Sequence, residues 1–206
     1  SDVGQRRYGM YEFVLKGIKK KPNKVLLTDT RDVVFQNDLF KNKFKKSINF
    51  FLEGAKILND SRNSRWLKRT VGENSFEKIK RKTISCSGTT IGNYNQILKY
   101  SILMKKYLML YPYKRPLRHL ITFKKVEPYD QAIHNYLIYN NFFNNIELHK
   151  NEFSKICTTA YMKKFLFDKK GQLRNRKNEL YSLIHQYDRS FHKNGLPIFN
   201  FKRIYG

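Results

Sequence analysis

The sequence predicts a single α/β domain over residues 1–206, in which a mixed sheet is flanked by helices. The chain has 206 residues, a length that suits one domain or two small ones. Hydrophobic residues make up 40% of the chain and aromatic residues 15%, which is enough apolar surface for a core despite a formal net charge of +26. Short apolar runs alternate with segments of helical periodicity, and no repeat or low-complexity linker separates them.

The helices are predicted from apolar spacing and from the residues that end each periodic segment. We expect helices over residues 5–20, over 66–80 with a break at Gly72, over 90–110, and from Asp130 to the asparagine-rich run at 140–145. Pro22 closes the first helix, and Pro112 and Pro116 end the third. Asp130 stands where an N-cap is expected.

The strands are predicted from short runs rich in β-branched and aromatic residues. We expect strands at 25–27, at 48–58 with a turn at Gly54, at 83–87 ending at Gly88, and at 146–148, 156–159 and 181–185. The continuous apolar run at 25–27 is typical of a strand buried on both faces. A polar loop is expected at 59–64, a charged turn at 168–171, and a basic irregular tail from about 190 to 206.

The charge and the cysteines exclude several classes of protein. A net charge of +26 favours partners that are polyanions, anionic lipids or phosphorylated ligands. Cys86 and Cys157 are not in a metal-binding spacing, so a disulfide scaffold or a thiolate zinc site is not expected, and a reducing compartment is. No apolar run reaches the ~18 residues of a membrane span, and the first residues do not resemble a secretory signal. We therefore expect a cytoplasmic protein, peripheral at most.

Acidic residues are scarce, yet Asp29 and Asp32 stand three positions apart, directly after the first predicted strand. Two adjacent carboxylates repel, so such a pair usually has a cation between them or shares a proton. One interpretation is a salt-bridged turn, with Arg31 as the cation. The other is a site for Mg²⁺ or Mn²⁺, ions that take one or two carboxylates together with ligand phosphates.

Three further segments contain candidate functional groups, and each also has a purely structural interpretation. Residues 84–92 suggest a strand, a turn of small residues and a helix start, whose backbone N–H groups would receive an anion or a sugar hydroxyl. Asp130 and Gln131 stand at a helix start, where they cap the helix or bind substrate. His185 offers a neutral imidazole as a metal ligand, although a lone histidine is more often structural.

Taken together, the motifs TDTRDVVFQ (28–36), CSGTTIG (86–92), YDQAIHN (129–135) and HQYDR (185–189) resemble glycosyltransferases of the GT-A fold. The resemblance is closest to a family whose aspartate motif reads Asp-x-Arg-Asp. It extends from about Lys24 to Arg189 and implies a GT-A-like, Rossmann-like α/β fold. By the same resemblance, the segment before Lys24 is short, so we expect the unit to be incomplete at its N-terminus and to bind a nucleotide sugar weakly.

The resemblance also implies roles for residues of the acidic motif. Asp32 looks like the aspartate that holds Mn²⁺ or Mg²⁺ against the donor diphosphate, and Asp29 looks like its partner, reaching the metal or the donor ribose. His185 looks like the C-terminal metal ligand. Arg31 is expected to balance charge beside the aspartates.

Further roles are implied for the donor sugar and the acceptor. Ser87 and Gly88 match the turn against the donor sugar, and Asp130 with Gln131 matches the acid pair that faces donor and acceptor. Asp130 is the candidate base if the reaction inverts configuration. The expected activity is hexosyl transfer from a nucleotide-sugar donor to a glycan or lipid-linked acceptor, as in polysaccharide biosynthesis.

Two other functions are compatible with the same sequence. A nucleic-acid-binding protein suits the charge and the aromatic content, although the basic residues are spread along the whole chain and no nucleic-acid-binding motif is present. A metal-dependent nuclease would use Asp29, Asp32, Asp130 and His185 for phosphodiester hydrolysis. Peripheral contact with anionic membrane, through residues 40–46 and 99–115, is compatible with the transferase.

Overall fold

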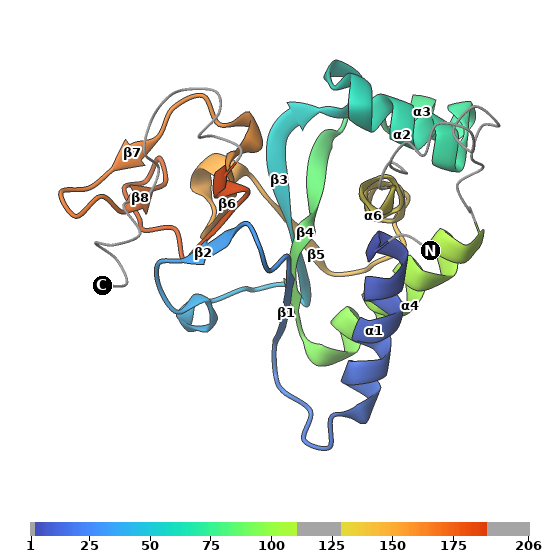
Figure 1. Cartoon of the computed structure of the whole chain (residues 1–206), viewed down its shortest axis with the longest axis horizontal. Helices are drawn as coiled ribbons and strands as arrows, with labels where there is room; N and C mark the ends of the chain where they lie inside the picture. Colours follow the sequence, from blue (N-terminus) through green and yellow to red (C-terminus); the bar gives the residue numbers. More distant parts are fainter. Residues whose placement is uncertain (1–2, 111–128, 189–206) are drawn as a thin grey trace.

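The main sheet has four strands in the order β1-β4-β3-β5 (Figure 1). These strands are β1 (Val25–Thr28), β3 (Ile48–Lys56), β4 (Thr83–Gly92) and β5 (Ile146–His149). Strand β4 is antiparallel to both neighbours, whereas β3 and β5 are parallel. This computed structural model of the chain describes residues 3–110 and 129–188, and it confirms the predicted α/β class with a mixed sheet.

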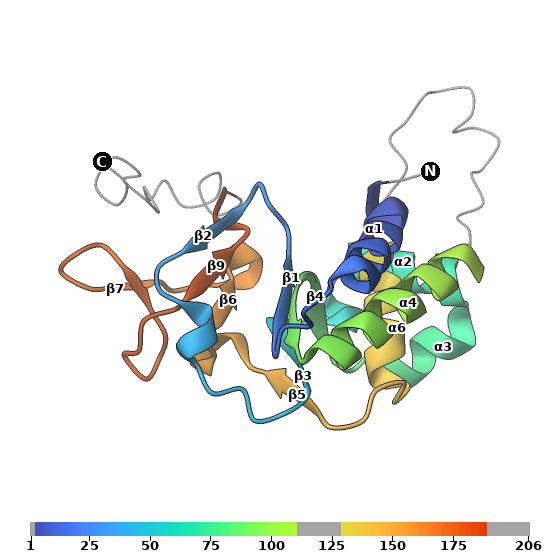
Figure 2. The same ribbon diagram turned by 90° about the horizontal axis from the view of Figure 1, so that it is seen from below.

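Helices cover one face of this sheet, as Figure 2 shows. They are α1 (Val3–Gly17), α2 (Ser61–Val71), α3 (Glu73–Ile79), α4 (Tyr94–Leu110) and α6 (Asp130–Tyr139). Phe50 of β3 is fully buried in the core between the sheet and these helices, together with Tyr100, Met104 and Ile133. The buried positions of α4 follow the predicted helical spacing, so burial of this apolar stripe stabilises the helix against the sheet.

A second, three-stranded sheet lies on the other face of the main sheet (Figure 2). Its strands, in the order β2-β9-β6, are β2 (Val33–Phe35), β9 (Leu183–His185) and β6 (Ile156–Thr158). Phe51, next to Phe50, points to this side and packs with Ile156 and Leu183. Adjacent residues of β3 therefore fill two different cores, because successive side chains of a strand point to opposite faces. A short ribbon of β7 (Leu166–Phe167) and β8 (Leu173–Arg174) extends from the second sheet.

Several sequence predictions about local structure are wrong. Strand β1 is half-buried rather than fully buried, because it is at the end of the sheet order and pairs with β4 alone among the described strands. Strand β3 continues through Gly54, whose φ of +92° coincides with a shift in strand register instead of a turn. The expected loop at 59–64 contains the start of α2, where the Asp60 side chain accepts a hydrogen bond from the backbone N–H of Asn63.

Other predictions are confirmed within the described residues. Helices α2 and α3 meet at Gly72, which has a φ of +86°, a conformation that glycine adopts without strain. Helix α6 ends at Tyr139, directly before the asparagine-rich run. Pro112, Pro116 and the basic tail at 190–206 lie outside the described residues, so those expectations are not tested.

Candidate metal centre

The candidate metal centre forms where the two sheets meet. Asp29 follows β1, and its backbone N–H donates to the carbonyl of Gly88 in β4 at 2.9 Å. Asp32 precedes β2, and its carbonyl accepts from the N–H of Gln186, directly after β9, at 2.7 Å. The segment that joins β1 to β2 is thus hydrogen-bonded to both sheets, which places its two carboxylates beside His185 at the end of β9.

The three predicted metal ligands lie together. His185 Nε2 is 3.2 Å from Asp29 Oδ2 and 3.5 Å from Asp32 Oδ1. Ligand atoms of all three residues lie within 4.8 Å of one another. An ion with bonds of about 2.0–2.2 Å holds adjacent ligands roughly 3 Å apart, so this spacing fits a single Mg²⁺ or Mn²⁺. Two carboxylates and an imidazole are ligands that Mn²⁺ accepts.

The residues of the cluster shift one another's pKa values. Burial lowers the pKa of His185, but contacts with Cys86, Asp29 and Asp32 raise it more strongly, to about 12. We attribute the rise to the carboxylates, because burial also raises the pKa of Cys86 and so keeps this thiol neutral. Burial raises the pKa of Asp29, but the hydrogen bond from His185 and the charge of Arg7 outweigh it, so the pKa falls below its usual value. Asp29 is therefore ionised, as a metal ligand must be, whereas His185 is protonated and has to release its Nε2 proton when it binds a metal ion.

Gly88 allows the strand to approach the cluster closely. A Cβ atom built on Gly88 would lie 2.4 Å from His185 Cε1 and 2.6 Å from Asp29 Oδ2, far inside normal contact distance. The sequence predicted a turn with exposed N–H groups here, but β4 runs through to Gly92. Residues 89–92 pair with β1, and residues 90–92 also pair with β3, so most of this segment's backbone is used by the sheet and the prediction of a turn is wrong.

We expect Gly88→Ala to weaken metal binding, because its Cβ would displace the side chains of His185 and Asp29. Since His185 is fully buried, the change should also lower the free energy of unfolding by about 1–3 kcal/mol. The affinity for Mn²⁺, measured by electron paramagnetic resonance titration, should fall by about 10-fold or more. Gly92→Ala is the matched control in the same strand, since its Cβ would meet the backbone oxygen of Ser47 at 2.7 Å. That change should lower the free energy of unfolding by about 1–3 kcal/mol and leave the affinity of the folded protein unchanged. Equal Mn²⁺ affinities for wild type and Gly88→Ala would contradict the placement.

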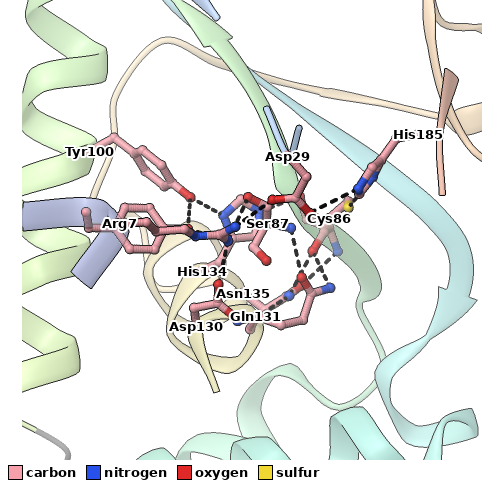
Figure 3. A network of polar contacts seen from close by, with 12 residues as sticks. Arg7, Asp29, Cys86, Ser87, Tyr100, Asp130, Gln131, His134, Asn135 and His185 are labelled. Atoms are coloured by element: carbon pink, nitrogen blue, oxygen red, sulfur yellow. Dashed lines mark hydrogen bonds and ion pairs between the residues drawn. The ribbon is translucent and has the colours of Figure 1, made fainter. Parts of the chain in front are cut away.

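Arg7 is a site residue that the sequence did not reveal. It lies on α1, and its guanidinium donates to Asp29 Oδ1 at 2.6 Å and to Asp130 Oδ2 (Figure 3). Burial lowers the pKa of Arg7, whereas Tyr8, Asp130 and Asp29 raise it, and the net pKa lies above the usual value. Arg31, the cation expected here, is exposed and has no ion pair within residues 3–110 and 129–188. Arg7 therefore supplies the balancing charge, and the prediction for Arg31 is wrong.

Asp130 and Gln131 begin α6 and face the same region. Tyr129, and not Asp130, is the N-cap residue, so the predicted cap is corrected. The side chain of Gln131 accepts from the N–H of Ser87 at 2.8 Å and donates to the carbonyl of Ser85 at 2.9 Å. Gln131 thus fixes α6 against β4, and the N–H of Ser87 is already used. Asn135 adds two further hydrogen bonds to Ser85.

A buried polar chain continues behind the site, also unpredicted from the sequence. His134 Nε2 lies 2.9 Å from Ser85 Oγ, and His134 Nδ1 lies 2.8 Å from the Tyr100 hydroxyl, which lies 3.3 Å from that of Tyr8 (Figure 3). His134 is completely buried, and burial lowers its pKa to about 3, with a further lowering from the charge of Arg7. The imidazole is therefore neutral and bridges two hydroxyl groups.

This shift predicts acid sensitivity. Because the pKa of His134 is about 3 when folded and about 6.5 when unfolded, the unfolded chain binds more protons between these values. Stability contributed by neutral His134 is complete above pH 6.5 and is lost as the pH falls, by up to about 1.4 kcal/mol per pH unit. The free energy of unfolding, measured with urea at several pH values, should fall less steeply with decreasing pH in His134→Gln than in wild type. The same pH dependence in both proteins would contradict a neutral, buried His134.

In comparisons with protein-family models and with curated proteins, nothing matches this sequence. No helix among residues 3–110 and 129–188 has the length and hydropathy needed to cross a bilayer. The functional argument therefore depends on the geometry of the site.

Proposed function

We propose that this chain is a metal-dependent glycosyltransferase of the GT-A type, moving a hexosyl group from a nucleotide-diphosphate donor to a glycan or lipid-linked acceptor. One observation carries the proposal: Asp29, Asp32 and His185 converge within 4.8 Å. His185 is 156 positions from Asp29 in the chain, and Arg7 joins the cluster to Asp130. A salt-bridged turn alone would not need the buried imidazole.

Asp29, Asp32 and His185 would hold Mn²⁺ or Mg²⁺. Such an ion supplies stabilisation of the negative charge that develops on the leaving diphosphate. Arg7 holds the carboxylates of Asp29 and Asp130 in fixed positions. In an inverting reaction, Asp130 accepts the proton of the acceptor hydroxyl, a step that requires hydrogen-bond distance. We assign Ser87, Gly88 and Gln131 to the side of the site that holds the donor sugar.

The proposed location is cytoplasmic, with peripheral contact to anionic lipid. Lys41, Lys43, Lys45 and Lys46 are exposed around Phe40, which is itself 50% exposed. Each lysine near an anionic surface contributes about 1 kcal/mol to binding. Equal flotation with neutral and anionic liposomes would remove this part of the proposal.

The deciding experiment is a screen of nucleotide sugars for hydrolysis with and without Mn²⁺, on the chain and on Asp32→Ala. We expect at least one donor to be hydrolysed only with Mn²⁺ and only by the wild-type chain. Oligonucleotides in Mg²⁺ form the parallel arm, because the same acidic cluster suits phosphodiester hydrolysis. Asp32-dependent cleavage of an oligonucleotide, without donor hydrolysis, would establish the nuclease instead.

A further inference from the structure

A second candidate binding site lies in a cleft of about 820 Å³ between β3 and the β7–β8 ribbon. In Figure 1, β6 of the second sheet is seen between β3 and the β7–β8 ribbon. Glu53 and Gly54 of β3 form one wall, and Leu166 and Arg174 of the ribbon form another. The volume is in the range of small-molecule sites, and it suits a few sugar units better than a nucleic-acid duplex.

The cleft has an excess of positive charge. Its lining includes five basic residues, Lys150, Lys163, Lys164, Arg174 and Arg176, and two acidic ones, Glu53 and Glu152. Both arginines are engaged within the protein, Arg174 with Asp168 at 2.9 Å and Arg176 with Glu152 at 2.7 Å.

The three lysines are the groups available to a ligand. Lys150, Lys163 and Lys164 are exposed, and none of them forms an ion pair with a residue in the described ranges 3–110 and 129–188. Ammonium groups gathered at one opening attract an anion, and they do so more strongly in a cleft than on an open surface.

The remaining lining is suited to a carbohydrate. Leu52, Met162 and Tyr161 provide apolar surface, and the Tyr161 hydroxyl donates to Asp60, which fixes the position of its ring. A carboxylate such as that of Glu152, whose side chain is 47% exposed, accepts hydrogen bonds from sugar hydroxyls but repels a continuous phosphate backbone. A hydroxyl-rich ligand with separate anionic groups therefore fits better than a nucleic acid.

The cleft is connected to the candidate metal centre through Glu53. This residue is 5% exposed, and its Oε1 accepts from Gln131 Nε2 at 3.4 Å. Gln131 also accepts from the N–H of Ser87, beside Gly88. Two hydrogen bonds, between Glu53 and Gln131 and between Gln131 and Ser87, thus connect the lining of the cleft with the residues assigned to the donor sugar.

We propose that this cleft binds an acidic saccharide, whose carboxylate, sulfate or phosphate groups contact Lys150, Lys163 and Lys164. As an acceptor site, the assignment rests on the proposed glycosyltransferase function. The binding itself does not, because it depends only on the charge and shape of the cleft.

The test compares Lys163→Ser/Lys164→Ser with a control that loses the same charge, Lys19→Ser/Lys20→Ser, an exposed pair after α1. Calorimetry would use a glucuronate-containing tetrasaccharide, its carboxyl-reduced neutral counterpart, a sugar phosphate and a single-stranded oligonucleotide. We expect an acidic saccharide to bind wild type, with affinity falling about 10-fold in the cleft variant and less than 2-fold in the control. Which acidic probe binds more tightly identifies the anionic group.

Equal losses in both variants, equal binding of the neutral saccharide, or tightest binding of the oligonucleotide would overturn the cleft assignment. Far-ultraviolet circular dichroism confirms that the exposed substitutions leave the fold intact. Mn²⁺-dependent donor hydrolysis is measured separately. If hydrolysis is present and cleft binding is absent, the inference alone fails. If lysine-dependent binding is present and hydrolysis is absent, the proposed function and the acceptor role fail, and the saccharide site stands.

Discussion

Asp32→Asn is expected to abolish metal-dependent turnover. The change keeps the shape of the side chain and removes the charge that faces His185 Nε2 at 3.5 Å. Loss of one of three ligands should lower Mn²⁺ affinity by more than about 10-fold, and donor hydrolysis by more than about 100-fold. Mn²⁺ titration and donor hydrolysis measure the two effects independently.

Asp38→Asn is the matched control for this prediction. Asp38 is an exposed aspartate nearby in the chain, and its side chain accepts from the N–H of Phe40 at 2.9 Å, a bond that asparagine retains. Both variants remove one negative charge, so a general electrostatic effect would appear in both. Unchanged Mn²⁺ binding in Asp32→Asn would remove the candidate metal centre and the proposed function with it.

Arg7→Met is expected to impair both stability and turnover. Without the guanidinium, the carboxylates of Asp29 and Asp130 lose the cation that both of them contact. Removing one partner of a fully buried ion pair costs about 3–5 kcal/mol, and because the Asp29 side chain is 34% exposed we expect roughly 2–3 kcal/mol here. Displacement of the two carboxylates should lower turnover by about 100-fold.

A double variant separates these two effects. In Arg7→Met/Asp130→Asn the repulsion is relieved, so part of the lost unfolding free energy should return, whereas turnover should not. Arg81→Met, at an exposed position before β4, is the control for loss of an arginine. If Arg7→Met unfolds at the same urea concentration as wild type, Arg7 does not stabilise the carboxylates of Asp29 and Asp130.

The candidate metal ligands Asp29 and Asp32 were predictable because their signal is local: two acids stand three positions apart, directly after an apolar strand of a basic chain. His185 was predicted from the set of motifs that the segment around it completes. Arg7 was not predictable in this way, since it is 22 residues from Asp29 and 123 from Asp130 in the sequence. Nothing in the spacing distinguishes Arg7, which points to carboxylates, from its exposed neighbour Arg6 on the same helix.

The errors in the predicted fold also have physical causes. Strands β2, β7 and β8 are not predicted from the sequence, because they contain only two or three residues, too few to show the two-residue alternation of a strand. Gly88 was interpreted as a turn because glycine usually interrupts strands, whereas here it permits close packing of His185 and Asp29 against β4. The capping signal at Asp60 was present but was assigned to a loop.

The segment between β1 and β2 is hydrogen-bonded to both sheets, so the candidate ligands are held by two different sheets. Asp29 is fixed to the main sheet and Asp32 to the second sheet, while His185 belongs to the second sheet itself. An ion bound by all three residues would link the two sheets, each of which packs around its own hydrophobic core. The affinity for the metal would then depend on the relative position of the two sheets. Substitutions in the core of the second sheet would therefore change metal affinity even where they contact no ligand.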